Sequence, residues 1–182
     1  MNPFRRFRNE KLPETLETQE VKDRREHSES RVNDLIFSCQ SLRDVLAVLG
    51  DRKEMTTEID GLGEVIFRQK ADSNHKALTV IVKGEETKRV VQVTENSDGG
   101  IQLTHENTHE KKRVGEKIIP VTDTDFFKIV GLHTEHTASR DGLPLPLDSS
   151  STKIDMQVAN LKSICEQLGD WALSCSQTVT IG

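Results

Sequence analysis

"GEVIFRQKADSNHKALTVIVKG", residues 63–84, contains two runs of β-branched and other apolar residues on either side of a polar segment. Val, Ile, Thr and Phe favour strands, whereas the Asp, Ser and Asn between the runs favour a tight turn. The stretch therefore predicts a β-hairpin, and it is the strongest indication of fold class in the chain.

Further runs of the same kind follow at 86–95, 101–107 and 116–123, and the turn-forming segment NSDGG lies at 96–100. Short strands joined by tight turns typically form antiparallel sheets. We therefore expect an antiparallel β-meander of four to six strands over residues 54–122.

Apolar residues at helical spacing lie on both sides of this sheet in the sequence. A first apolar stripe runs through residues 32–49 and is followed by Gly50, a typical helix C-cap, which predicts a helix over 30–49. A second apolar stripe predicts a helix over 153–176. The two apolar stripes consist of Val32, Leu35, Cys39, Leu42, Leu46 and Leu49, and of Ile154, Val158, Leu161, Cys165, Leu168, Ala172 and Cys175.

The segment between the sheet and the second helix contains capping residues and then helix breakers. Thr122 or Asp123 could cap a helix that Gly131 ends, so we expect a short helix over 123–130. Residues 132–152 are rich in Gly, Pro and Ser, which predicts a loop.

Together these elements predict an α+β fold, with the antiparallel sheet flanked by a long N-terminal and a long C-terminal helix. Residues 1–29 are dominated by charged side chains, which predicts a flexible arm or, from about residue 14, a solvated extension of the helix. Residues 30–182 are then expected to form a single α+β domain, a usual length for one domain.

The composition limits the classes of function. The net charge of −5 argues against broad nucleic-acid binding, and the hydrophobic fraction of 34% predicts a small core or burial against a partner. No apolar run approaches the length of a membrane span, and no signal peptide is evident. The three cysteines lack metal-site spacing, which predicts free thiols in an intracellular, cytoplasmic protein that is not secreted.

One short motif resembles a catalytic metal site. "HENTH", residues 105–109, matches the H-E-x-x-H pattern of zinc hydrolases, in which His105 and His109 bind zinc and Glu106 acts as the base. That chemistry requires a helix, because in a strand the two histidines lie roughly 13 Å apart. Flanking glycines and weak helix formers favour a strand or turn, so we expect neither a metal site nor a cofactor.

Two basic segments support a second alternative, nucleic-acid binding or contact with an acidic partner. The first consists of Arg5, Arg6 and Arg8, and the second of Lys111, Lys112 and Arg113, with Lys83, Lys88 and Arg89 on neighbouring predicted strands. Aromatic side chains, on which single-stranded nucleic acids stack, are missing from these strands.

The function that we favour from the sequence is non-enzymatic assembly or adaptor activity, with the zinc hydrolase and the nucleic-acid-binding protein as alternatives. The two apolar stripes could cover the sheet, or they could dock on a second copy of the chain or on another protein. The interface residues expected in that case are Leu35, Leu42, Leu46, Leu49, Val158, Leu161 and Leu168.

Overall fold

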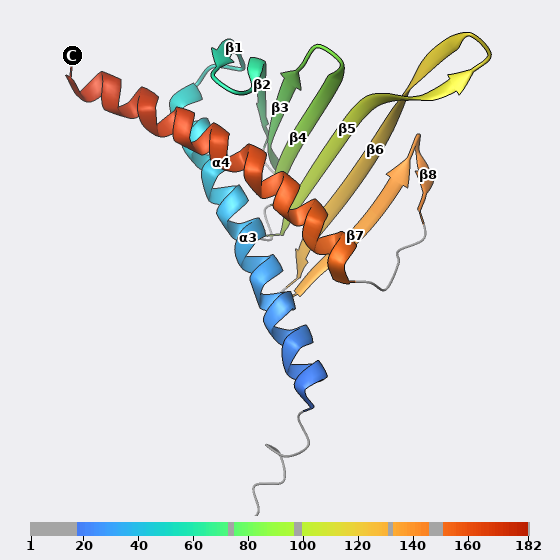
Figure 1. Ribbon diagram of the computed structural model, residues 1–182. Helices are drawn as coiled ribbons and strands as arrows, with labels where there is room; N and C mark the ends of the chain where they lie inside the picture. Colours follow the sequence, from blue (N-terminus) through green and yellow to red (C-terminus); the bar gives the residue numbers. More distant parts are fainter. Residues whose placement is uncertain (1–17, 73–74, 97–99, 131–132, 146–150, 182) are drawn as a thin grey trace, which may run out of the picture.

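The computed structural model describes residues 18–72, 75–96, 100–130, 133–145 and 151–181. Two long helices cross over one face of an antiparallel sheet (Figure 1). The elements in chain order are α3 (Gln19–Leu49), β1 (Glu54–Ile59), β2 (Gly63–Ala71), β3 (His75–Lys83), β4 (Thr87–Asn96), β5 (Ile101–Val114), β6 (Lys117–Val130), β7 (His133–Arg140), β8 (Leu143–Pro144) and α4 (Ser151–Ile181).

The sheet is a meander in which every strand pairs with the next one along the chain, in the order β1 to β8. The predicted α+β class and the antiparallel sheet between two long helices are confirmed. The number of strands is corrected, because the described residues form a sheet of eight strands rather than four to six, and it extends well beyond residue 122.

The additional strands account for two wrong predictions. Residues 123–130, expected to form a short helix, are the second half of β6, and the expected loop over 132–152 contains β7, β8 and the first residues of α4. A helix was expected because Asp123 and Asp125 interrupt the alternation of apolar and polar residues that marks a strand. Both aspartates lie on the helix-facing side of β6, where apolar residues are usual.

The helices differ from their predicted bounds mainly at their outer ends. Helix α3 begins at Gln19 rather than at residue 30, and the Thr18 side chain accepts a hydrogen bond from the backbone N–H of Val21. Residues 19–29, assigned to a flexible arm, are therefore helical, while residues 1–17 lie outside the described part of the chain. The helix ends at Leu49 as expected, and Gly50 has a φ of 57°.

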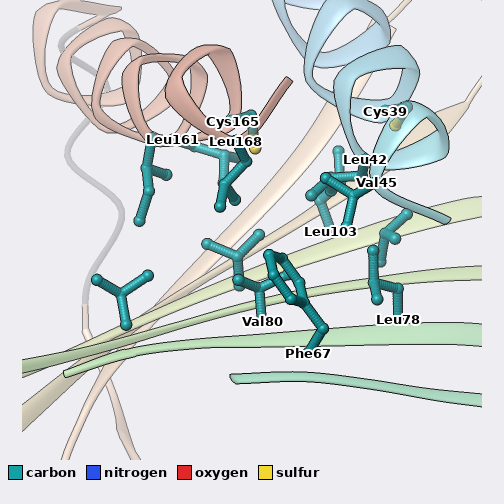
Figure 2. Close-up of a cluster of buried hydrophobic side chains, with 14 of the residues drawn as sticks. Cys39, Leu42, Val45, Phe67, Leu78, Val80, Leu103, Leu161, Cys165 and Leu168 are labelled. Atoms are coloured by element: carbon teal, nitrogen blue, oxygen red, sulfur yellow. The ribbon is translucent and has the colours of Figure 1, made fainter. Parts of the chain in front are cut away.

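The hydrophobic core lies between the two helices and the face of the sheet that they cover (Figure 2). Phe67 and Phe127 are its largest fully buried side chains. Along β3, Leu78, Val80 and Val82 alternate with residues of the opposite face, as expected of a strand with one buried side. We call the helix-covered side the inner face of the sheet.

The helices contact each other directly as well as through the core. At Gly169 of α4, an added Cβ would lie 3.0 Å from the Cβ of Ser41 on α3, so the absence of a side chain permits the close approach. Lys162 pairs with Asp34 across the same interface at 3.0 Å. Within the described residues, neither helix has an apolar stretch that could cross a bilayer.

Candidate functional site

The HENTH stretch lies in the middle of β5, so the predicted strand is confirmed. His105 and His109 point to the inner face, because residues four positions apart in a strand share a side. Four strand steps separate them by roughly 13 Å, which a single zinc ion with bonds of about 2 Å does not span. The H-E-x-x-H geometry is therefore not formed, and no group of three metal-ligating side chains occurs among the described residues.

Instead, His105 belongs to a polar network on the inner face of β4 to β7. The Arg89 Nε donates to His105 Nε2 at 3.4 Å, and Asp125 lies opposite His105 on β6. Burial, and then the Arg89 guanidinium, lower the pKa of His105 to about 4, so its ring is neutral. Arg89 also donates to the backbone carbonyl of Asn160 at 3.5 Å, which places the network beneath α4.

Asp125 links this network to β7. Its Oδ1 lies 2.8 Å from Nε2 of His136, and the His136 ring stacks on Phe127 with 4.7 Å between ring centroids. Both partners are almost fully enclosed, with side-chain exposures of 6% for His136 and 10% for Asp125. The pair therefore replaces apolar packing at the β7 end of the core and fixes the position of β7 against β6.

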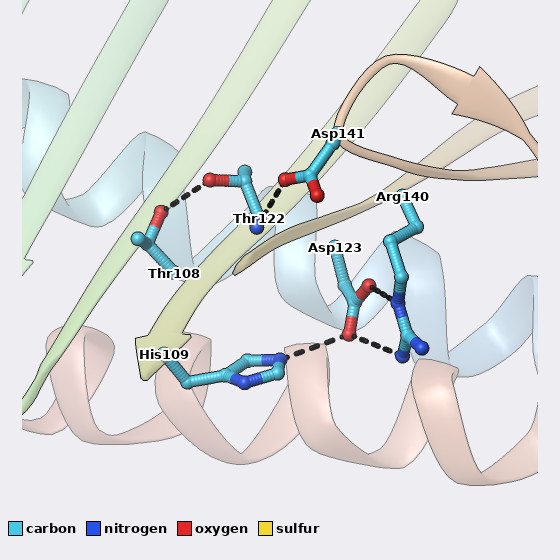
Figure 3. A network of polar contacts seen from close by, with 6 residues as sticks. All are labelled: Thr108, His109, Thr122, Asp123, Arg140 and Asp141. Atoms are coloured by element: carbon cyan, nitrogen blue, oxygen red, sulfur yellow. Dashed lines mark hydrogen bonds and ion pairs between the residues drawn. The ribbon is translucent and has the colours of Figure 1, made fainter. Parts of the chain in front are cut away.

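A second group continues the network toward solvent (Figure 3). Asp123 lies 3.0 Å from His109 Nε2 and accepts two hydrogen bonds from Arg140, at 2.7 and 3.1 Å. The hydrogen bonds from Arg140, and to a smaller extent the contact with His109, hold the pKa of the Asp123 carboxyl below its ordinary value. The neighbouring contacts, also drawn in the figure, join Thr108 to Thr122 at 2.9 Å and the Thr122 N–H to Asp141 at 3.0 Å.

The paired groups are histidines and aspartates, which catalytic sites also use, but among the described residues no nucleophilic side chain bonds to the Nδ1 atoms of these rings. The ring nitrogens of His109 and His136 contact Asp123 and Asp125 on one side, and their Nδ1 atoms are buried without a hydrogen-bond partner. No serine or cysteine therefore bonds to either ring. The network's evident effect is to hold β5, β6 and β7 in register.

Two of the three cysteines are also poor nucleophiles. Cys39 and Cys165 are buried free thiols, as the sequence predicted, and burial raises their pKa values to about 11 and about 12. Cys175 is a free thiol that is only partly buried. Protonated thiols in the core do not attack substrates, since the thiolate is the reactive form.

The residues expected to form an interface between molecules lie mostly in the core of one chain. Leu42, Leu161 and Leu168 point between the helices and the sheet in Figure 2. Six of the seven predicted interface residues are at most 1% exposed, namely Leu35, Leu42, Leu49, Val158, Leu161 and Leu168. The seventh, Leu46, is partly buried. Their apolar character is therefore explained by the core of a single chain.

The exposed apolar residues of the sheet are concentrated in one hairpin. Residues 110–114 of β5 extend beyond the last pair with β4, and residues 117–122 of β6 extend beyond the first pair with β7. The hairpin therefore projects from the sheet as a two-stranded ribbon (Figure 1). We call residues 111–120 the projecting ribbon, and every one of them is exposed.

The projecting ribbon combines positive charge with apolar surface. Its predicted contact residues Lys111, Lys112 and Arg113 are all exposed, and Arg89 does not join them because it lies beneath α4. Three apolar residues lie among them, namely Val114, Ile118 and Ile119, with exposures of 51%, 60% and 40%. Arg5, Arg6 and Arg8, the other predicted basic segment, lie outside the described residues.

A groove of about 420 Å³ lies near the β1 edge of the sheet, between the β1–β2 turn and the C-terminal half of α4. We call it the acidic groove, because its charged lining residues, Glu58, Asp60 and Asp170, are all carboxylates. Trp171 supplies an aromatic wall and stacks on Phe67 at 5.0 Å. The complete lining is Glu58, Ile59, Asp60, Gln167, Asp170, Trp171 and Ser174.

Sequence reasoning missed both the polar network and the acidic groove. The alternation of Asp123, Asp125 and Phe127 was a signal for the network, but it was interpreted as a helix cap. The groove has no local signal, because its lining comes from two segments about a hundred residues apart. No family model, curated protein or solved structure matches this chain.

Proposed function

We propose that the chain is a non-enzymatic protein–protein interaction or assembly protein that docks through the projecting ribbon. The observation that carries this proposal is the exposure of Val114, Ile118 and Ile119 on a hairpin that extends beyond its pairs with β4 and β7. Apolar residues gathered on one exposed element are characteristic of interaction sites. An unsupported two-stranded hairpin is also only marginally stable in water, so a bound partner would stabilise it.

The role of the helices in this proposal differs from the one expected from the sequence. The apolar stripes already cover the inner face of the sheet, so they would support docking by holding a rigid sheet beneath the ribbon. The intracellular location that we propose accords with the free thiols Cys39 and Cys165.

The basic charge of the projecting ribbon also favours nucleic-acid binding as an alternative function. A two-stranded ribbon fits the major groove of DNA, and lysines and arginines contact phosphates. We favour a protein partner because Ile118 and Ile119 lie within the ribbon, and nucleic-acid backbones offer no apolar surface to match them. The two functions predict different cross-linked products.

A photo-crosslinking amino acid at Ile118 tests the proposal in cells. Gln92, an exposed residue on the face of β4 that the helices do not cover, is the matched control position. We expect protein adducts at Ile118 that are absent at Gln92. Adducts with nucleic acid alone would favour the alternative, and the absence of any adduct specific to Ile118 would contradict docking through the ribbon.

A further inference from the structure

We propose that the projecting ribbon of one chain docks in the acidic groove of a second copy, which makes assembly head-to-tail. This inference rests on the proposed docking function and names its partner. It combines two surfaces of the described chain that have complementary charge and matching apolar residues.

The charge of the ribbon requires a negative partner. Residues 111–120 carry four cationic side chains and one carboxylate, a net charge of +3, whereas the whole chain has −5 and the remainder therefore −8. The cations are Lys111, Lys112, Arg113 and Lys117, and among the side chains that the structure describes none of them forms an ion pair. The ribbon is thus a positive element on an acidic molecule.

Pairing between two ribbons is disfavoured by the same charges. Edge-to-edge addition of two copies would bring lysine and arginine side chains of like charge close together, which destabilises a sheet. Lysines on exposed edges are a common protection against such pairing. A symmetric ribbon-to-ribbon dimer is therefore unfavourable, and the positive ribbon needs a different, negative surface on its partner.

The acidic groove provides that surface. Glu58, Asp60 and Asp170 are exposed, and none of the ion pairs among the described residues involves them. Trp171 lies among these carboxylates and, because it is partly exposed, can contact the apolar residues of the ribbon. A cation placed over the face of a Trp ring is further stabilised, which suits Arg113.

Both surfaces cannot meet within one molecule. The groove adjoins β1, whereas the ribbon belongs to β5 and β6, and three strands separate β1 from β5. At about 4.8 Å per strand the separation is roughly 19 Å, and the ribbon projects away from α4 in Figure 1. Contact therefore requires a second copy and uses two different patches, a geometry that produces rings or filaments.

The size of the contact limits its strength. The ribbon offers ten residues, whereas a stable interface uses about 20–30 residues on each side. The attraction between unpaired charges also weakens with salt. We therefore expect weak, concentration-dependent association that decreases as ionic strength rises.

Sedimentation velocity on charge-reversed variants tests this contact. The ribbon variant is K112E/R113E/K117E, and the groove variant is E58K/D60K/D170K. The control, K70E/K76E/K128E, has the same charge change as the ribbon variant, at exposed lysines on β2, β3 and β6 outside both surfaces. Each is measured across a concentration series at low salt and in about 0.5 M NaCl, where the Debye length is roughly 4 Å.

We expect the wild-type chain and the control to associate at low salt. The ribbon variant and the groove variant, each measured alone, should self-associate at least about tenfold more weakly. A mixture of the ribbon and groove variants should regain association, because each then offers the other a surface of opposite charge. A wild-type chain that stays monomeric throughout, or a mixture that regains nothing, would overturn the head-to-tail contact.

The outcome also separates this inference from the proposed function. Association that persists in the ribbon and groove variants would overturn the head-to-tail contact but leave assembly standing. A monomeric chain that still forms protein adducts at Ile118 would overturn self-assembly and leave docking on another protein. Only the combination of a monomer with no such adducts would remove both.

Discussion

Gly169 is a residue whose role depends on its neighbour rather than on its helix. Glycine inside a helix costs about 1 kcal/mol relative to alanine, so its presence in α4 needs a compensating contact. The Cβ and Oγ of Ser41 would each lie 3.0 Å from an added Cβ at this position. The close approach of α3 and α4 is therefore the compensation.

We predict that Gly169→Leu lowers the free energy of unfolding by about 1–3 kcal/mol, because the larger side chain forces the two helices apart. Ala159→Leu is the control, since Ala159 is exposed on the same helix. Urea denaturation compares the two variants, and equal effects would show that the helices do not meet closely at Gly169.

His105 makes stability depend on pH through its lowered pKa. That pKa is about 4 in the folded chain, against 6.5 for the ordinary group. Between these values the unfolded chain binds more protons, so the unfolding free energy decreases as the pH falls from 6.5 toward 4. We predict a contribution from His105 of about 2 kcal/mol to the loss between pH 7 and pH 5.

The contribution of His105 is measured by urea denaturation at both pH values in His105→Gln and the wild type. The variant should lose less stability on acidification, because glutamine does not titrate in this range. His75→Gln replaces an exposed histidine and serves as the control, which should keep the wild-type difference. An unchanged pH dependence in His105→Gln would contradict the prediction.

At the scale of elements, the two helices use their apolar stripes inside the molecule. Leu168 of α4 is fully buried, whereas Leu173, five residues later, is 53% exposed. The same residue type therefore has different roles on the two sides of one helix. The difference follows from the orientation of α4 over the sheet.

We predict that Leu168→Ala lowers the free energy of unfolding by about 2–5 kcal/mol, because it leaves a cavity in the core. Leu173→Ala removes the same atoms from an exposed site and should change stability by less than about 0.5 kcal/mol. Chemical denaturation measures both values. The reverse order would mean that α4 turns its other side to the sheet.

The projecting ribbon is an element that the core does not need. We predict that replacing residues 111–119 with Asn-Gly, a favoured two-residue hairpin turn, changes the unfolding free energy by less than about 0.5 kcal/mol. The sheet from β1 to β4 and both helices remain intact in this variant. Thermal and urea denaturation check the result, and a large loss of stability would show that the ribbon supports the fold.

At the scale of the whole molecule, the low apolar fraction of 34% is distributed unevenly. Apolar side chains predominate on the inner face from β1 to β4, where Arg89 is an exception, whereas histidines, aspartates and Arg140 occupy much of it at β5 to β7. The core is therefore completed by hydrogen-bonded polar pairs at one end. Buried polar groups with partners avoid the desolvation cost that unpaired ones incur.

Closure of the whole core protects two of the cysteines. We predict that in the native state a thiol reagent labels Cys175 and leaves Cys39 and Cys165 unmodified, because both are buried and have raised pKa values. Mass spectrometry after brief labelling locates the modified residues. In a denaturant all three should react, and equal native reactivity would indicate that the helices open readily.

The candidate surfaces could be foreseen only in part. The basic run at Lys111–Arg113 is continuous in the sequence, so its charge was evident, but its projection from the sheet depends on where β4 and β7 stop pairing. The groove joins Asp60 to Trp171 and requires α4 to lie beside the β1–β2 turn. Such long-range contacts leave no local pattern in the chain.

Local sequence patterns determined the class of fold, the strand character of 101–107 and the C-terminal end of α3, because alternation, helical spacing and Gly50 are local properties of the chain. Tertiary structure decided what the apolar stripe of each helix packs against, that 123–130 and 133–140 are strands, and where the histidines find aspartates. Polar β6 and β7 are held by pairing with neighbouring strands and by contacts such as His136 with Asp125. Those stabilising contacts exist only after distant segments have come together.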